Sequence, residues 1–142
     1  MEIEKEYIFV YGTLRRGFKV GARSFFENFT KFLSVGYIQG KLFEVSFFPA
    51  LIQSNNQNDK VSGEIYEIIK EKERFFRRID YYEGSMYERK KINVISLEGD
   101  QIQCWVYLYI KPVTKLEEIP SGDYIQYAND NPRKFRDIFE KS

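Results

Sequence analysis

The stretch that decides the fold lies close to the N-terminus and reads Ile8-Phe9-Val10-Tyr11-Gly12-Thr13-Leu14-Arg15-Arg16-Gly17. An apolar, β-prone run over residues 7–11 is followed by a glycine, a hydroxyl residue, two arginines and a second glycine. This order is typical of a strand that ends at a loop with an exposed, unusually free backbone. Consecutive N–H groups there would suit a carboxylate or a developing negative charge, although an ordinary strand-end turn has the same local sequence. The loop lacks the Gly-x-Gly-x-x-Gly and Gly-Lys-Ser/Thr patterns, so it is not interpreted as a phosphate-binding loop.

The composition predicts a single domain over residues 1–142. The chain is 43% hydrophobic, and at this size folding buries roughly two-thirds of the surface of the unfolded chain, so one sizeable core is feasible. Aromatic residues make up 18% of the sequence, which favours a β-rich interior and a pocket with aromatic walls.

The charge balance and the cysteine content bear on partners and location. The chain has 22 basic and 21 acidic residues, and its net charge of +1 argues against a nucleic-acid partner or a membrane surface. No apolar run is long enough to span a bilayer, and the charged N-terminus is unlike a signal peptide. A single cysteine, Cys104, excludes an internal disulfide. We therefore expect a cytoplasmic monomer or weak dimer.

The sequence contains no histidine. This excludes Ser-His-Asp and Cys-His nucleophile arrangements, histidine-ligated zinc and imidazole proton shuttles. General acid/base catalysis must then use a carboxylate, a tyrosine or a lysine. Cys104 lies in an apolar strand pattern, which predicts a buried, inert thiol rather than a nucleophile.

The periodicity of the chain predicts mixed α and β structure. Strands are expected over residues 7–11, 32–43, 61–68, 87–97 and 101–111, with a hairpin turn at Glu98-Gly99-Asp100. Helices are expected over residues 22–29 and 71–82, and a C-terminal helix is expected from Asn131-Pro132 through Phe139. Glycines within residues 32–43 indicate a bend or a close backbone approach, as in a small barrel. Residues 49–52 form a brief apolar segment, residues 53–60 a solvated loop and residues 119–124 a turn.

Glu83 differs from the other acidic residues. It ends the second helical pattern in Ile79-Asp80-Tyr81-Tyr82-Glu83-Gly84, between tyrosines and a glycine. Partial desolvation there would raise its pKa toward that of a useful acid/base group. From the residues alone, a surface glutamate near a helix end is the better-supported interpretation.

Several motifs together favour a functional role for Glu83 instead. In order along the chain they are residues 10–17, 40–43, 48–52, 61–66, 79–84, 87–89 and 122–123. The most specific combination is Tyr11-Gly12-Thr13-Leu14 with Tyr82-Glu83-Gly84. From residue 8 to about residue 124 the chain resembles the gamma-glutamylcyclotransferase-like family, in its gamma-glutamylamine cyclotransferase and avirulence-induced-gene-like branch. The resemblance implies an α+β fold, a small mixed β-barrel with a few flanking helices and a cavity at one end.

The resemblance also implies a reaction and the residues that perform it. The expected enzyme cyclises the γ-glutamyl group of a small-molecule substrate to 5-oxoproline and releases an amine or an amino acid, without metal or cofactor. Glu83 would be the acid/base, and the loop would hold the glutamyl group through Tyr11, Gly12, Thr13 and Leu14. Three further residues either support the pocket or simply pack: Tyr87, Arg89 and Tyr107.

Two departures from the family pattern bear on substrate choice. Tyr124 stands where the family commonly has tryptophan after Gly-Asp, and residues 18–21 lack an asparagine often found there. Two other functions remain as alternatives. One is a binding protein that keeps the pocket without turnover, and the other is a small nucleic-acid-binding barrel, which the near-neutral charge opposes. The sequence does not identify the amine that the reaction releases.

Overall fold

The computed structural model describes residues 4–46 and 48–136. Its elements, in chain order, are β1 (Glu6–Val10), α1 (Gly21–Phe29), β2 (Thr30–Val45), β3 (Phe48–Gln53), β4 (Lys60–Ile68), α2 (Lys72–Glu83), β5 (Tyr87–Ser96), β6 (Gln101–Tyr109), β7 (Glu117–Glu118) and α3 (Tyr124–Asp130). The predicted combination of helices and strands is confirmed.

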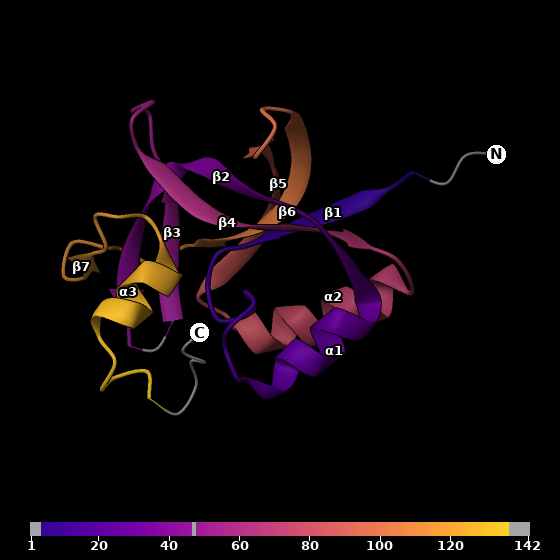
Figure 1. Ribbon diagram of the computed structural model, residues 1–142, viewed down its shortest axis with the longest axis horizontal. Coiled ribbons are helices and arrows are strands. Elements are labelled where there is room, and N and C mark those ends of the chain that lie inside the picture. Colours follow the sequence, from indigo (N-terminus) through magenta and orange to yellow (C-terminus); the bar gives the residue numbers. More distant parts are fainter. Residues whose placement is uncertain (1–3, 47, 137–142) are drawn as a thin grey trace.

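Five of the strands close into a barrel (Figure 1). They are neighbours in the order β2, β4, β1, β6 and β5, and β5 pairs with β2 to complete the circle. The pair β1–β6 is parallel and the other pairs are antiparallel. The second half of β2 leaves the barrel and pairs with β3 and β7. The predicted small mixed β-barrel is therefore confirmed.

Gly36 lies where the barrel closes. It pairs with Ser96 of β5 and with Gly63 of β4. A side chain at position 36 would bring its Cβ within 2.5 Å of the backbone oxygen of Ile95. The expectation of a close backbone approach at a glycine within this strand holds here, because only a residue without Cβ lets β5 come near enough to pair.

Two hydrophobic clusters share the strand β1, because its side chains alternate between opposite faces. The cluster inside the barrel includes Phe9, Ile38, Ile65, Val94 and Val106. The cluster between the barrel and the helices α1 and α2 includes Ile8, Val10, Phe26, Phe75 and Ile79. Figure 1 shows α1 and α2 side by side against the barrel, with α3 on the side where β3 and β7 lie. The end of β1 is thus where the two clusters meet.

Several local predictions agree with the structure. The first two helices lie within a residue of their predicted bounds, and Gly84 ends α2 with φ of +87°. Gly99, with φ of +92°, lies in the turn between β5 and β6. Cys104 is fully buried, and burial raises the pKa of its thiol to about 12. This burial agrees with the prediction that the Cys104 thiol is inert.

The prediction of a C-terminal helix from Asn131 was wrong for the described residues. The helix in this region is α3, which begins at Tyr124, inside the predicted turn, and ends at Asp130. Asp123 is its N-cap, and the carboxylate accepts hydrogen bonds from the N–H groups of Ile125 and Gln126. Pro132 disfavours helical geometry at residue 131, so Asn131-Pro132 marks the end of a helix. The rest of the predicted helix, residues 137–139, lies outside the described residues.

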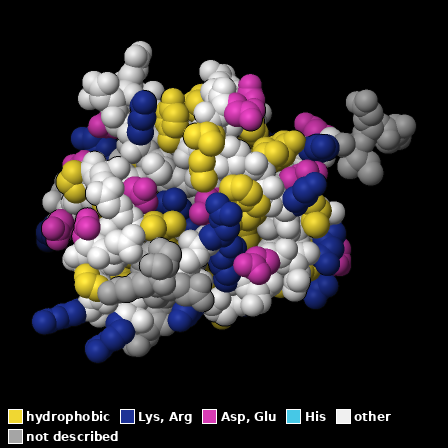
Figure 2. All heavy atoms as spheres, in the orientation of Figure 1, with side chains coloured by type: hydrophobic (Ala, Val, Ile, Leu, Met, Phe, Trp, Pro, Cys, Tyr) yellow, Lys and Arg dark blue, Asp and Glu magenta, His cyan; other side chains and the backbone are white. Residues whose placement is uncertain are grey.

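The short apolar segment at residues 49–52 is also more than was predicted, because it lies in the strand β3. On the face shown in Figure 2, basic and acidic side chains are interspersed with hydrophobic ones. Among the described residues, no helix has the length and apolar character needed to cross a membrane.

Candidate active site

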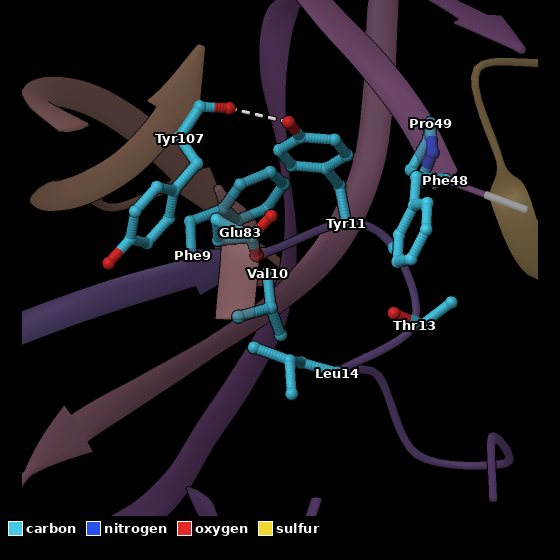
Figure 3. A pocket seen from close by; sticks show the side chains of 10 residues that line it. Phe9, Val10, Tyr11, Thr13, Leu14, Phe48, Pro49, Glu83 and Tyr107 are labelled. Atoms are coloured by element: carbon cyan, nitrogen blue, oxygen red, sulfur yellow. Dashed lines mark hydrogen bonds between the residues drawn. The ribbon is translucent and has the colours of Figure 1, made fainter. Parts of the chain in front are cut away.

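A cavity opens at the end of β1, where the two hydrophobic clusters meet (Figure 3). The space there is about 340 Å³ with the open solvent at its mouth counted, and the enclosed part has room for little more than a water molecule. Residues from β1, the following loop, the start of β3, the end of α2 and β6 form its wall: Phe9, Val10, Tyr11, Gly12, Thr13, Leu14, Phe48, Pro49, Glu83 and Tyr107. The two sequence motifs, 69 residues apart at Thr13 and Tyr82, are therefore brought to one place.

The loop after β1 is a tight turn. The N–H of Arg15 donates to the carbonyl oxygen of Gly12 over 3.0 Å, and the N–H of Arg16 donates to Glu64 Oε1 over 3.0 Å. Neither bond uses the N–H groups of Gly12, Thr13 or Leu14. The three residues line the cavity, and backbone N–H groups at such a turn could serve an anion or a carbonyl oxygen.

Gly12 is needed for a steric reason. A Cβ at this position would lie 2.7 Å from Pro49 Cγ and 2.9 Å from Pro49 Cδ. Its φ is outside the left-handed region, so backbone freedom is not what requires glycine here. Pro49 is held in turn by Tyr87, whose hydroxyl donates to the Pro49 carbonyl oxygen over 2.7 Å.

A buried polar network holds the other side of the loop. Arg15 follows the loop and is 7% exposed, and its guanidinium donates to Asp123 Oδ1 over 2.9 Å. Its Nε lies 3.6 Å from Glu64 Oε2. Glu64 is 3% exposed and also accepts a hydrogen bond from the Tyr66 hydroxyl at 2.7 Å. A buried carboxylate with these partners fixes the path of the chain directly after Leu14, because losing one partner would leave a charge buried and unpaired.

Glu83 is the last residue of α2, and its side chain lies beside those of Phe9 and Val10 in the cavity lining (Figure 3). Burial raises its pKa to about 8, and the negative charge of Asp80 one turn earlier raises it further in the same direction. No hydrogen bond from a described residue contributes to this shift. A carboxyl group with this pKa can both accept and return a proton near neutral pH.

Asp80 stays ionised because two residues hold it. Partial burial alone would raise its pKa, but hydrogen bonds from Arg89 and from the Tyr107 hydroxyl outweigh this and lower it. Arg89 donates to both carboxylate oxygens, at 3.0 and 3.2 Å, and Tyr107 donates to Oδ1 at 2.6 Å. The Arg89 guanidinium also lies 3.8 Å from the ring centroid of Phe76. Asp80 is therefore a fixed negative charge beside Glu83.

Two tyrosine hydroxyls connect the loop to its surroundings. The Tyr82 hydroxyl lies 2.5 Å from Thr13 Oγ1, which ties the residue before Glu83 to the loop. The Tyr11 hydroxyl donates to the backbone oxygen of Tyr107 at 2.5 Å, as the dashed line in Figure 3 shows. Burial raises the pKa of Tyr11 well above its usual value, so its hydroxyl stays protonated.

The structure brings most of the expected residues together. Those that line the cavity are Tyr11, Gly12, Thr13, Leu14, Glu83 and Tyr107. Tyr87 lies one contact behind the wall, where it bonds to Pro49. Arg89 lies farther back, because it bonds to Asp80, which is outside the wall and accepts a hydrogen bond from Tyr107. Sequence reasoning missed the network around Glu64 and the partners Asp80, Tyr82 and Pro49. Asp80 could have been found from its spacing, because residues three apart on a helix are neighbours.

Comparisons with known proteins identify relatives of this chain. Residues 8–126 match the family described as "Gamma-glutamyl cyclotransferase, AIG2-like". A relative from Methanocaldococcus jannaschii, described provisionally as a gamma-glutamylcyclotransferase, is 36% identical over 125 residues, covering 86% of this chain and 98% of the relative. The gamma-glutamylaminecyclotransferase of Rattus norvegicus is 32% identical, with 71% of this chain and 76% of that protein covered. The crystal structure of an AIG2-like protein from Mus musculus has a TM-score of 0.69 at 28% identity, covering 86% of this chain and 89% of that one.

The fold and the site define a small barrel protein with a partly buried glutamate in the same cavity as a strand-end loop. The chain belongs to the gamma-glutamyl cyclotransferase, AIG2-like family, and it is an enzyme of that type.

Proposed function

We propose that this enzyme cyclises the γ-glutamyl group of its substrate to 5-oxoproline and releases the attached amine, with Glu83 as the acid/base. The observation that carries the proposal is the Glu83 carboxyl group, which lines the cavity and has its pKa raised to about 8. An ordinary surface glutamate would be ionised throughout the neutral range and would return a proton poorly.

The reaction requires little more than folding of the substrate and proton transfer. The α-amine of the glutamyl group attacks its own γ-carbonyl carbon, a carbon–nitrogen bond closes the five-membered lactam, and the bond to the leaving nitrogen breaks. Because the nucleophile belongs to the substrate, correct orientation can contribute roughly 7–11 kcal/mol of the barrier.

Two protons pass from the α-nitrogen to the leaving nitrogen in this sequence, and Glu83 would carry them in turn. Its carboxylate accepts the first from the α-ammonium group, which makes the amine nucleophilic, and returns it to the leaving nitrogen. It then takes the second from the nitrogen that has closed the ring and passes it to the released amine, which leaves as an ammonium ion. The positive ammonium group of a bound substrate would itself lower the pKa of Glu83 and favour the ionised form needed for the first step. Atoms balance without water, and no charge is left behind on the enzyme.

The loop would stabilise the negative charge of the substrate and of the reaction. The N–H groups of Gly12, Thr13 and Leu14 are the candidates to hold the glutamyl carboxylate or the oxyanion that forms at the γ-carbonyl. The tight turn and the Arg15 network support this proposal, because donors that are already fixed in place need no reorganisation when the charge develops.

The test is a panel of γ-glutamyl amino acids, γ-glutamyl-ε-lysine and simple γ-glutamyl amines, with 5-oxoproline measured as product. We expect turnover of at least one compound by the wild-type enzyme. Glu83→Gln should retain binding of 5-oxoproline and lose turnover by a factor of about 10²–10⁴. Glu88→Gln, at an exposed glutamate of β5, is the matched control and should be as active as wild type.

Two results would contradict the proposal. Activity of Glu83→Gln within a few-fold of wild type would remove Glu83 from the mechanism. Binding of 5-oxoproline by wild type without turnover of any panel member would indicate a binding protein that keeps the pocket.

A further inference from the structure

Phe48, the first residue of β3, marks the open side of the cavity. It is 42% exposed, whereas every other residue of the cavity lining is buried or half-buried. Most of the space of the cavity lies at its mouth rather than in its enclosed part. A bound substrate must therefore lie partly in the mouth, against the exposed part of the Phe48 ring.

The position of Phe48 is fixed by its neighbours. Its backbone pairs with Val45 across the antiparallel strands β2 and β3, and the next residue, Pro49, is buried and accepts the hydrogen bond from Tyr87. The ring of Phe48 meets that of Tyr82 edge-on, with ring centroids 6.4 Å apart and an interplanar angle of 77°. Tyr82 directly precedes Glu83, so this exposed apolar ring lies close to the end of α2 that carries the proposed acid/base.

The mouth offers no basic side chain to a carboxylate. Among the described residues that line the cavity, the charged group is Glu83, and none is lysine or arginine. The arginines near the site are engaged elsewhere, because Arg15 and Arg89 pair with carboxylates of the protein and Arg78 lies over the ring of Phe25. A carboxylate on the leaving group would meet ionised Glu83 with no cation to balance it, and this repulsion disfavours such a substrate.

We infer that the cavity mouth is a subsite for the amine that the reaction releases, and that Phe48 selects γ-glutamyl amides of apolar amines, aromatic ones above all. This inference rests on the proposed cyclisation. The γ-carbonyl must lie within reach of Glu83 and the loop, so the group on the leaving nitrogen extends outward along Phe48. An apolar group there removes the exposed part of the ring from water, and an aromatic group can also pack edge-on or offset against it.

The first test compares two amides that differ by a phenyl ring, γ-glutamylethylamide and γ-glutamyl-2-phenylethylamide. For wild type, kcat/KM should be at least about tenfold higher for the phenylethylamide. Phe48→Ala should lose most of this preference, chiefly through a higher KM, because the ring contacts the leaving group both before and during the reaction. The intrinsic reactivity of each amide is the same with every variant, so a change in the ratio reports the contact with Phe48.

The second test adds a charge to the leaving group. γ-Glutamylphenylalanine differs from γ-glutamyl-2-phenylethylamide by one carboxylate, and wild type should prefer the phenylethylamide. Phe48→Arg should reverse this preference, because a guanidinium group at the mouth can pair with the carboxylate. A residue that only stabilised β3 would not give a gain for one substrate when it is replaced.

Phe32→Ala is the matched control. Phe32 is 38% exposed, close to the exposure of Phe48, but it lies on β2 and does not line the cavity. It should keep both preferences. 5-Oxoproline lacks the leaving group, so its dissociation constant in Phe48→Ala should stay near that of wild type. Melting temperatures of all variants show whether each one is folded at the assay temperature.

Three results would overturn the inference while the proposed function stands. The first is an equal preference for the phenylethylamide in wild type and Phe48→Ala. The second is a dissociation constant for 5-oxoproline that rises in Phe48→Ala as much as the KM of the phenylethylamide, which would place Phe48 at the glutamyl group. The third is the absence of any gain for γ-glutamylphenylalanine in Phe48→Arg. If wild type turns over no γ-glutamyl compound, the proposed function fails and this inference fails with it.

Discussion

Thr13 Oγ1 and the Tyr82 hydroxyl lie 2.5 Å apart and join the strand-end loop to the end of α2. Glu83 follows Tyr82 directly, so this hydrogen bond sets how the proposed acid/base faces the loop. The two motifs are thus coupled by a contact between side chains, in addition to sharing one cavity.

We expect that contact to show as an interaction between two substitutions. Thr13→Val and Tyr82→Phe each remove one hydroxyl and should lower kcat/KM by about tenfold, with a coupling energy of about 0.5–1.5 kcal/mol in a double-mutant cycle for stability. Thr13→Ser keeps the hydroxyl and the backbone path and should be tolerated. Additive effects of the two substitutions would show that the hydrogen bond contributes nothing.

Asp80→Asn should lower the pKa of Glu83, because it removes the nearby negative charge that raises it. If Glu83 must be ionised to act, kcat/KM of the wild type rises with pH to an apparent pKa near 8. In Asp80→Asn this rise should occur at lower pH. Asp100→Asn, in the exposed turn after β5, is the control and should leave the profile in place. A pH profile unmoved by Asp80→Asn would remove Asp80 from the tuning of Glu83.

Glu83 should make folding less favourable as pH rises. Its folded pKa of about 8 lies above the 4.5 of the free side chain, so between these values the folded protein holds a proton that the unfolded chain has released. In this window the free energy of unfolding of wild type, relative to Glu83→Gln, should fall by up to about 1.4 kcal/mol per unit of pH. Chemical denaturation of both proteins between pH 5 and 8.5 measures this. A difference that is constant with pH would mean that Glu83 has an ordinary pKa.

Gly12→Ala should damage both the site and the fold. The added Cβ meets the Pro49 ring, which cannot move aside as a flexible side chain would, so the loop must shift. We expect kcat/KM to fall at least tenfold and the melting temperature to fall by several degrees, with a larger loss for Gly12→Val. Pro49→Ala in the Gly12→Ala background should restore part of both. Gly21→Ala, at a helical glycine with open space around it, is the control and should be neutral or stabilising.

Full activity in Gly12→Ala would mean that the loop lies differently when substrate is bound. Failure of Pro49→Ala to restore any activity would show that the side chain at position 12 meets the substrate itself.

Most of the strands and the first two helices could be predicted from the sequence, because hydrophobic period is a local signal, whereas the barrel was implied by the family resemblance. The identity of the motif residues was equally readable, and the resemblance then implied a shared site. The geometry was not readable, because Thr13 and Tyr82 meet only through the packing of α2 on the barrel. The chain after Gly122 differs from the prediction, because Asn131-Pro132 follows the end of α3 and Asp123 caps its start.

Glu64 shows a second limit. The alternation of the sequence in β4 puts Glu64 on the opposite face from Val61 and Ile65, together with Tyr66. In the structure both faces of β4 are covered, one by the barrel interior and one by the loop and α1. A strand's own sequence cannot say what covers its second face, so a buried ion pair with Arg15 could not be predicted from it.

The site lies at the interface between the barrel and the helices. The loop after β1 belongs to the barrel, and Glu83 belongs to α2, which packs on the barrel. A small movement of α2 away from the barrel would separate Glu83, the proposed acid/base, from the loop after β1, while the barrel remains intact. Activity should therefore be lost on heating before the barrel melts. For the same reason, a ligand bound at this interface should slow amide hydrogen exchange in α2 and in β1 together.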